Sequence, residues 1–259
     1  MVDWLMIIDN SAQMTDIPSI LSQNPKVLLY HDGENQGIAV RLNMAANEAV
    51  KRNATWMLTM DQDSSFGDGS LPEYFKSIST FPENEQVGMF GITHDEKQQR
   101  EQPCSENVYT LITSGSVVNL SILRQLQGFD ENLFIDEVDT EYCFRVRIAG
   151  FKVILFSHIC LTHRLGKKEQ HISLKNFKAT DRTLYPPMRL YYLVRNHLYL
   201  KRKYNKLLPQ EIKKRRKHLF IYLKNSFLYN NNKWQAIKSV LKAIKDFNVG
   251  QMGKAISKK

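Results

Sequence analysis

The chain has 259 residues, of which 42% are hydrophobic and 24% charged, and its formal net charge at pH 7 is +10. This composition is typical of a globular protein with a sizeable core and excludes an intrinsically disordered chain. Its apolar runs fall far short of the roughly 20 residues that cross a bilayer, which excludes a membrane-spanning helix. Cys104, Cys143 and Cys160 lack the paired spacing of a zinc site or a disulfide framework, so we predict a reducing, cytoplasmic location.

Charge is distributed unevenly along the chain. Residues 1–140 carry 8 Lys and Arg against 21 Asp and Glu, whereas residues 141–259 carry 28 against 5. An acidic half suits a site that holds cations, and a basic half suits a surface that attracts phosphate or anionic lipid. We therefore expect the two halves to perform different tasks.

Short apolar runs alternate with helical patterns in the first part of the chain. Most of these runs lack polar alternation, as expected of strands buried on both faces; they are residues 4–8, 26–30, 55–60, 87–92 and 152–156. Between the second and third runs, apolar residues recur at helical spacing from Ile38 to Ala49. This alternation predicts an α/β sheet with crossover helices.

Beyond about residue 180 the strand patterns stop. Two prolines, Pro186 and Pro187, interrupt the chain, and the remainder is helical in pattern and strongly basic. We therefore predict an α/β domain over residues 1–180 and a basic helical C-terminal region over residues 181–259.

Polar side chains follow each of the first three predicted strands. Asp9 follows the first strand, Asn35 comes after the second, and Asp61 and Asp63 come directly after the third. Because the carboxyl ends of strands in an open α/β sheet meet at one edge, where ligands bind, we expect these residues to converge. Two carboxylates one residue apart can hold Mg²⁺ or Mn²⁺ and leave coordination positions for a diphosphate. The alternative, that they only cap a turn, stays open at this point.

A second informative stretch is GFDENLFIDEVDTEYCFRVRIAGF, residues 128–151. It predicts a helix over about residues 137–149, with Asp136 as N-cap. Asp139 lies in the first turn, where a carboxylate can simply complement the helix dipole. Glu141 and Arg145, four residues apart, predict a surface ion pair.

Six motifs, in this order, resemble the family 2 glycosyltransferases with the GT-A fold. They are IIDNSA, NQGIAVRLNMA, MDQDSS, TSGSVVN, GFDENLFIDEVDTEYCFR and HRLG, and the resemblance covers nearly all of residues 3–200. Three segments, DQDS, FIDEVDTEYCFR and RLYYLVRN, are particularly similar to the bacterial rhamnosyltransferase branch. The resemblance implies a GT-A-like (Rossmann-like), mostly parallel sheet flanked by helices.

The implied activity is that of an inverting hexosyltransferase. It would move a sugar, with rhamnose from dTDP-rhamnose as first choice, from a nucleotide-sugar donor to a glycan or lipid-linked glycan acceptor in cell-surface polysaccharide synthesis. Another nucleotide sugar stays open, because donor identity rests on the branch resemblance alone.

The resemblance also implies donor-binding residues. Asp61 and Asp63 match the family's Asp-x-Asp, which binds a divalent metal, Mg²⁺ or Mn²⁺, and the nucleotide diphosphate. Asp9 matches the acidic residue that contacts the nucleotide base. Asn35 and Gly37 match the loop that lines the nucleoside pocket.

Further matches concern the transferred sugar and the chemistry. Ser114 and Gly115 match the segment beside the sugar and the acceptor, and His163 falls where family members place a histidine near the diphosphate. Asp139 matches the catalytic base. The glutamate that precedes this base in the wider family is replaced by Val138, as in the rhamnosyltransferase-like pattern.

One departure from the family concerns the start of the chain. Family members begin with an additional strand and helix whose turn lines the base pocket, and this chain starts at the equivalent of the second strand. The expectation is either a truncated chain or a partly lost donor site. A catalytically impaired glycosyltransferase-like binding or scaffold protein is therefore the alternative function.

The basic C-terminal region suggests a partner. The run KKRRK at residues 213–217 precedes an apolar stretch, and residues 234–247 carry an apolar stripe flanked by lysines. Helices of this kind can lie on an anionic membrane, so we predict peripheral attachment to the cytoplasmic membrane face. The alternative is that the stripe packs on the catalytic domain. No nucleic-acid module accompanies the charge, so we expect no nucleic acid partner.

Overall fold

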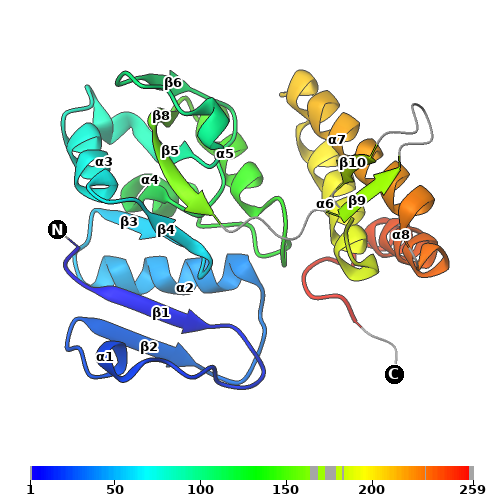
Figure 1. The fold of residues 1–259 in the computed structure, drawn as a ribbon, viewed down its shortest axis with the longest axis horizontal. Coiled ribbons are helices and arrows are strands. Elements are labelled where there is room, and N and C mark those ends of the chain that lie inside the picture. The colour runs from blue at the N-terminus through cyan, green and yellow to red at the C-terminus, as the bar shows by residue number, and fades with distance from the viewer. Residues whose placement is uncertain (1, 164–168, 173–178, 183, 231, 257–259) are drawn as a thin grey trace. The chain divides into compact units, whose positions relative to one another are not determined.

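The computed structural model describes residues 2–163, 169–172, 179–182, 184–230 and 232–256. The chain divides into two compact units (Figure 1): Met1–Thr162 together with Gly253–Lys259, and His163–Met252. The boundary predicted at residue 180 lies within the second unit.

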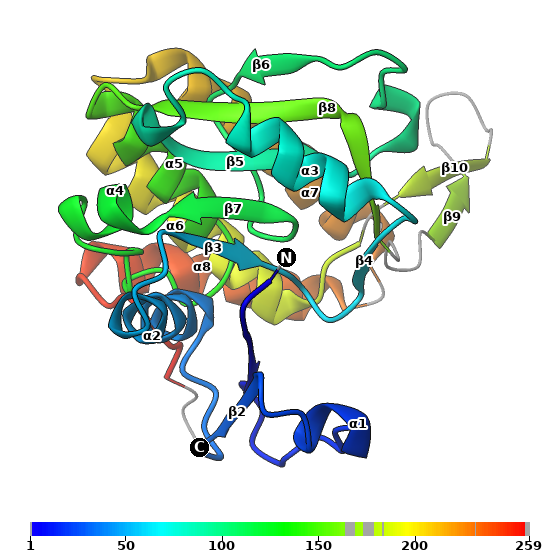
Figure 2. The ribbon, with the colours of Figure 1, turned by 90° about the vertical axis from the view of Figure 1, so that its left-hand side faces the viewer.

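A six-stranded sheet forms the centre of the first unit (Figure 2). Its strands are β3 (Trp56–Thr59), β4 (Ser64–Phe66), β5 (Val87–Thr93), β6 (Ser105–Asn107), β7 (Ser116–Asn119) and β8 (Lys152–His163). The spatial order is β3-β7-β5-β8-β4, with β6 also paired to β8. Because β7 is antiparallel to both β3 and β5, and β5 is parallel to β8, the strands β3, β5 and β8 run in one direction. The predicted α/β sheet is confirmed, with antiparallel strands among the parallel ones.

A separate two-stranded sheet precedes this one along the chain. Strand β1 (Leu5–Asp9) pairs in parallel with β2 (Val27–His31), and the short helix α1 (Ser19–Ser22) lies between them in sequence. All five strands predicted from the sequence are therefore present, within one residue at their starts.

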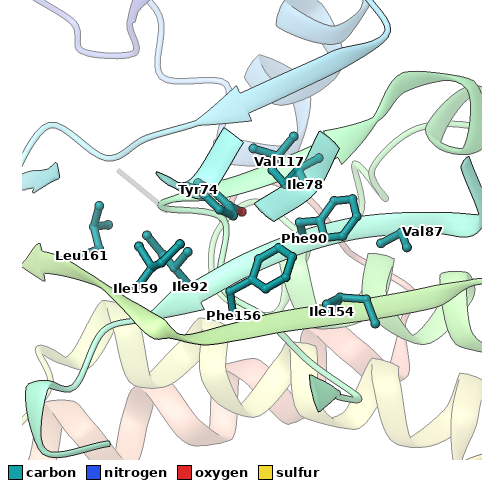
Figure 3. Close-up of a cluster of buried hydrophobic side chains, with 10 residues drawn as sticks. All are labelled: Tyr74, Ile78, Val87, Phe90, Ile92, Val117, Ile154, Phe156, Ile159 and Leu161. Carbon is teal, nitrogen blue, oxygen red and sulfur yellow. The ribbon is translucent and has the colours of Figure 1, made fainter. Parts of the chain in front are cut away.

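Helices cover both faces of the large sheet (Figures 1 and 2). The unit contains α2 (Ile38–Lys51), α3 (Ser70–Ser79), α4 (Leu120–Gln125) and α5 (Val138–Ile148), with short 3-10 turns at Asn84–Gln86 and Glu96–Gln98. Helix α3 packs on one face through Tyr74 and Ile78, which join the aromatic core shown in Figure 3. In that core the rings of Phe90 and Phe156 stack with centroids 5.5 Å apart.

Helix α5 lies very close to strand β5 on the opposite face. A Cβ atom at Gly88 would come within 2.7 Å of the Val146 side chain, so glycine allows this approach. The Tyr142 hydroxyl donates a hydrogen bond to the Gly88 carbonyl oxygen at 3.3 Å. These contacts fix the helix that carries Asp139 on the sheet.

The second unit is mainly helical. It contains the antiparallel hairpin of β9 (Glu169–Ile172) and β10 (Ala179–Arg182), followed by α6 (Pro187–Tyr204), α7 (Pro209–Tyr229) and α8 (Lys233–Asn248). Helix α6 packs against both α7 and α8, which also contact each other. In the described part of the chain, no helix combines the length and apolar character needed to cross a membrane.

A buried polar network joins α6 to α8. The Tyr191 hydroxyl donates to Asp246 Oδ2 at 2.7 Å, and Arg195, which is 0% exposed, donates to the Tyr191 hydroxyl at 3.1 Å. Burial, followed by the bond to Asp246, raises the pKa of Tyr191 to about 12. Lys242 forms an ion pair with Asp246. The network fixes which face of α8 points toward α6.

Candidate functional site

The turn after β3 carries the two predicted metal-binding carboxylates. Asp61 and Asp63 both have exposed side chains, and the Ser64 N–H donates to the Asp61 carbonyl oxygen at 3.2 Å, which closes the turn. The turn leads directly into β4, at the carboxyl end of β3. Both carboxylates therefore follow a strand of the large sheet, as predicted, whereas Asp9 and Asn35 follow β1 and β2 of the separate two-stranded sheet, so the predicted single sheet edge is not formed.

Ser114 supports this turn through hydrogen bonds to its two ends. Its side chain is buried, with 1% exposure, and its Oγ accepts the Asp61 N–H at 3.1 Å and donates to Ser64 Oγ at 2.9 Å. Gly115 follows with a positive φ of 73°, and its N–H donates to the Thr59 carbonyl oxygen at 2.8 Å. The structure thus brings Ser114, Gly115 and Asp61 together. The buried Ser114 side chain supports the turn, a role that the sequence analysis did not assign to it.

We expect Ser114→Ala to weaken metal-dependent donor binding. Removing the hydroxyl deletes the acceptor of the Asp61 N–H and costs about 1 kcal/mol of stability. Donor titration by calorimetry with and without Mn²⁺ measures the effect. The matched control is Ser116→Ala, because Ser116 is equally buried but donates to the Ile112 carbonyl oxygen at 2.6 Å. Equal losses of donor affinity in the two variants would show that Ser114 has no special role at the turn.

The two carboxylates suit a hard divalent cation. Carboxylate oxygens are the ligands that Mg²⁺ and Mn²⁺ prefer, and the exposed pair leaves room for water and phosphate oxygens. Among the described residues, no group of three or more His, Cys, Asp and Glu side chains is arranged to hold a metal ion.

Asp9 is bound within its own loop. Its carboxylate accepts hydrogen bonds from Ser11 and, at 2.7 Å, from the Thr15 N–H. The Ser11 hydroxyl, followed by the Thr15 N–H, holds the pKa of this carboxyl well below its usual range. Asp9 thus orders the loop of residues 11–15, and its contact with a nucleotide base stays a prediction.

Asn35 and Gly37 form the start of α2. Asn35 Oδ1 accepts the Gly37 N–H at 3.1 Å and an amide N–H of Asn10 at 3.2 Å. Asn10 Oδ1 in turn accepts the Gln36 N–H at 3.0 Å. The loops that follow β1 and β2 are therefore joined at the predicted nucleoside-binding segment.

Arg41 is a residue of this region to which the sequence analysis assigned no role. It is only 5% exposed, and it pairs with Asp32 at 2.5 Å and donates to Asn10 Oδ1 at 2.9 Å. The hydrogen bond from Arg41 lowers the pKa of Asp32 to about 2. Its position one turn after Gly37, within NQGIAVRLNMA, is the sequence signal that could have identified it.

The start of α2 also contacts the segment that leads into α5. The Ile38 N–H donates to the Phe134 carbonyl oxygen at 2.8 Å, and a Cβ atom at Gly37 would lie 2.6 Å from that oxygen. Farther along α2, the Asn43 side chain accepts the Phe129 N–H at 2.7 Å and donates to its carbonyl oxygen at 3.0 Å. The predicted nucleoside-binding segment and the segment that leads into α5 are thus packed together.

Asp139 lies in the first turn of α5 with a half-buried side chain. Its Oδ1 accepts the Thr140 N–H at 2.7 Å. The prediction that Asp136 is the N-cap is wrong, because the helix begins at Val138 and its N-cap is Glu137, with no capping side-chain bond. Asp136 and Glu137 both have positive φ angles, 61° and 68°, an uncommon backbone state for residues other than glycine.

The ion pair of Glu141 and Arg145, predicted at the surface, has a fully buried carboxylate and a half-buried guanidinium. Glu141 is 0% exposed, and Arg145 binds its carboxylate at 2.8 Å. Arg145 also donates to the carbonyl oxygens of Leu126 and, at 2.7 Å, Gly128. The carboxylate of Glu141 is shielded from solvent because residues 126–128 pack over the face of α5 that carries Glu141 and Arg145.

His163 is the last residue of β8, and its side chain lies outside the described residues. Its predicted place near a diphosphate therefore stays a prediction.

Comparison with known proteins gives one informative sequence relative. No family model matches the chain. The dTDP-rhamnosyl transferase RfbF of Shigella flexneri is 28% identical over 220 residues, which cover 77% of this chain and 71% of the relative.

Solved structures show the fold. The crystal structure of GalNAc-T7 with UDP, GalNAc and Mn²⁺ superposes with a TM-score of 0.53 at 12% identity, over 94% of this chain. The chain spans only about half of that protein, 51% of its length. The structure of Staphylococcus aureus TarS, residues 1–349, gives a TM-score of 0.47 at 12% identity over 96% of this chain and 74% of that one, a similarity too low to support a conclusion. The chain is thus similar in sequence to a dTDP-rhamnosyl transferase and similar in fold to a glycosyltransferase solved with UDP and Mn²⁺, in agreement with the resemblance to the family 2 glycosyltransferases.

Proposed function

We propose that the protein is an inverting glycosyltransferase that uses dTDP-rhamnose as donor and a glycan or lipid-linked glycan as acceptor in cell-surface polysaccharide synthesis. The observation that carries the donor proposal is the match to a curated dTDP-rhamnosyl transferase over 77% of the chain. A lipid-linked acceptor is available only at a membrane surface, so peripheral attachment to a membrane forms part of the proposal.

The proposed reaction needs one proton acceptor. The acceptor hydroxyl oxygen attacks the anomeric carbon, the bond from that carbon to the diphosphate oxygen breaks, and Asp139 takes the hydroxyl proton. A half-buried carboxylate at the start of α5 suits this role, because the packed helix holds it in a fixed position on the sheet. Inversion follows from a single displacement without a covalent enzyme intermediate.

Donor binding is assigned to two groups of residues. The Asp61–Asp63 turn would hold a divalent cation, which when bound neutralises charge on the departing diphosphate. The joined loops of Asn10, Asn35 and Gly37 would supply amide groups to the nucleoside. The hydrogen bond that the Asp61 N–H donates to Ser114 Oγ at 3.1 Å would hold the proposed metal-binding turn in place before the donor arrives.

A screen of nucleotide sugars tests the donor. We expect metal-dependent binding of dTDP-rhamnose that is stronger than that of UDP- and GDP-linked sugars, measured by calorimetry with Mn²⁺. Preference for another nucleotide sugar would replace the donor assignment and keep the enzyme class. If no donor binds, the chain lacks a working donor site and the proposed transfer is refuted.

We expect Asp63→Asn to make donor binding nearly insensitive to a chelator. Asparagine preserves the shape and turn-capping ability of aspartate but removes the charge that a divalent cation requires. The measurement is the donor dissociation constant with Mn²⁺ and with excess EDTA. The matched control is Asp68→Asn, which removes another exposed carboxylate five residues away. Unchanged Mn²⁺ dependence in Asp63→Asn would mean that this residue only caps the turn.

A further inference from the structure

We infer that the exposed faces of α7 and α8 form a docking surface for an anionic lipid membrane. The inference depends on the proposed function only for the choice of a membrane that carries the acceptor, because lipid binding needs neither donor nor acceptor. The residues that carry it all belong to the second unit.

Helix α8 exposes large apolar side chains together with lysines. Trp234, Lys238, Leu241 and Lys245 are spaced at i, i+4, i+7 and i+11, and all four are exposed. Trp234 is 77% exposed and Leu241 is 62% exposed. The opposite face is occupied, because Ala236, Ala243 and Asp246 are buried there. The helix therefore cannot turn this apolar face inward without breaking the bond from Tyr191 to Asp246.

Helix α7 repeats the same pattern. Lys213, Lys217, Phe220 and Lys224 have the identical i, i+4, i+7, i+11 spacing, and all four are exposed. Phe220 is 66% exposed, and its neighbour Ile221 is 47% exposed. The buried residues of this helix, Ile212, Asn225 and Ser226, lie on its other side. Two contacting helices thus each present apolar side chains between lysines.

The charge of these helices favours an anionic occupant. Together α7 and α8 contain ten Lys and Arg residues and two acidic residues. Both acidic residues have cationic partners: Glu211 pairs with Lys214 at 2.6 Å, and Asp246 pairs with Lys242. Most of the Lys and Arg side chains are exposed, and both acidic side chains of these helices are already paired.

The mixture of side chains distinguishes a membrane from other anionic partners. A nucleic acid would bind the lysines through its phosphates but would leave the aliphatic Leu241 and Ile221 in water. A lipid membrane can bind the lysines and also bury the aliphatic side chains. Aromatic and aliphatic side chains enter the boundary between headgroups and acyl chains, while lysines reach the lipid phosphates. A second copy of this surface is disfavoured, because it would bring two basic faces together.

Vesicle sedimentation with the full chain, in the absence of donor, tests the inference. We expect at least about tenfold tighter binding to vesicles containing about one third phosphatidylglycerol than to pure phosphatidylcholine, with binding weakened by salt. Replacing Trp234 and Leu241 by Ser should lower the affinity for anionic vesicles at least tenfold. Replacing Lys238 and Lys245 by Gln should reduce the preference for anionic over neutral vesicles.

The control is the double variant with Met188→Ser and Leu207→Ser, which removes two exposed apolar side chains of the same unit that lie outside the pattern. It should bind vesicles like the parent. Equal binding to neutral and anionic vesicles, or an unchanged affinity after the Trp234 and Leu241 replacements, would overturn the inference. Retention by a DNA or RNA duplex without binding to anionic vesicles would also overturn it.

The outcome is separable from that of the proposed function. A chain that binds anionic vesicles but transfers no sugar refutes the proposed transferase activity and supports the docking surface. A chain that transfers sugar in solution but does not bind vesicles supports the proposed transferase activity and refutes the docking surface, together with the membrane attachment proposed above.

Discussion

Asp139→Asn should reduce sugar transfer by at least about a hundredfold while leaving the fold and donor affinity close to those of the parent. Asparagine has the same shape, and its Oδ1 can still accept the Thr140 N–H that Asp139 binds at 2.7 Å. It cannot take up the acceptor proton. As a mere helix-start residue, Asp139 would contribute only about 0.3 to 1 kcal/mol of stability and nothing to turnover. Transfer rates at saturating donor distinguish the two roles.

A matched replacement sharpens this test. Asp136→Asn changes a carboxylate only three residues earlier, outside the helix, and should leave transfer within a few-fold of the parent. Glu141 is a poor alternative base, because it is 0% exposed and already binds Arg145. If Asp139→Asn retains nearly full transfer and Asp136→Asn loses it, the catalytic base is Asp136, and its assignment to Asp139 from the family resemblance is wrong.

Arg145→Met should destabilise the first unit by about 3 to 5 kcal/mol, because it removes the guanidinium that neutralises a buried carboxylate. The same change frees the carbonyl oxygens of Leu126 and Gly128 from their donor. Denaturant unfolding followed by intrinsic fluorescence measures the loss. The control is Arg147→Met, two residues farther along the same helix, which stacks on Tyr109 and should cost less than about 1 kcal/mol.

A double replacement separates loss of the pair from loss of packing. Changing both Glu141 and Arg145 to Met removes the uncompensated charge, so part of the stability should return. If Arg145→Met costs no more than Arg147→Met, the pair contributes little and the segment of residues 126–128 is held by other contacts.

The sequence predicted the long apolar strands well and the short polar ones poorly. Strands β4 and β6, with sequences SSF and SEN, have too few apolar residues to show a period and form because β8 offers them an edge. Strand β7 was visible only as the motif TSGSVVN, although it is fully buried between β3 and β5. Such pairings depend on contacts between residues distant in the sequence, which periodicity cannot reveal.

The candidate site shows a similar division. The carboxylates at the ends of strands follow from strand positions alone, so Asp61 and Asp63 were found where the sheet edge places them. The supporting roles of Ser114 and Arg41 were not predicted, because they depend on contacts between loops that are distant in the sequence. Burial of Glu141 was also missed, although α5 buries residues on most of its sides, from Val138 to Val146. When apolar residues occur on most sides of a helix, the helix is buried, and its charged side chains are expected to be buried too.

Gly37 has a consequence for engineering this enzyme. Because any larger residue there would collide with the backbone of Phe134, we expect that the proposed nucleoside loop and the segment before α5 cannot be exchanged independently between relatives. Chimeras that transplant residues 33–37 from a transferase with another nucleotide preference will need residues 129–137 from the same parent. Directed evolution of donor choice should accordingly yield paired changes in these two segments.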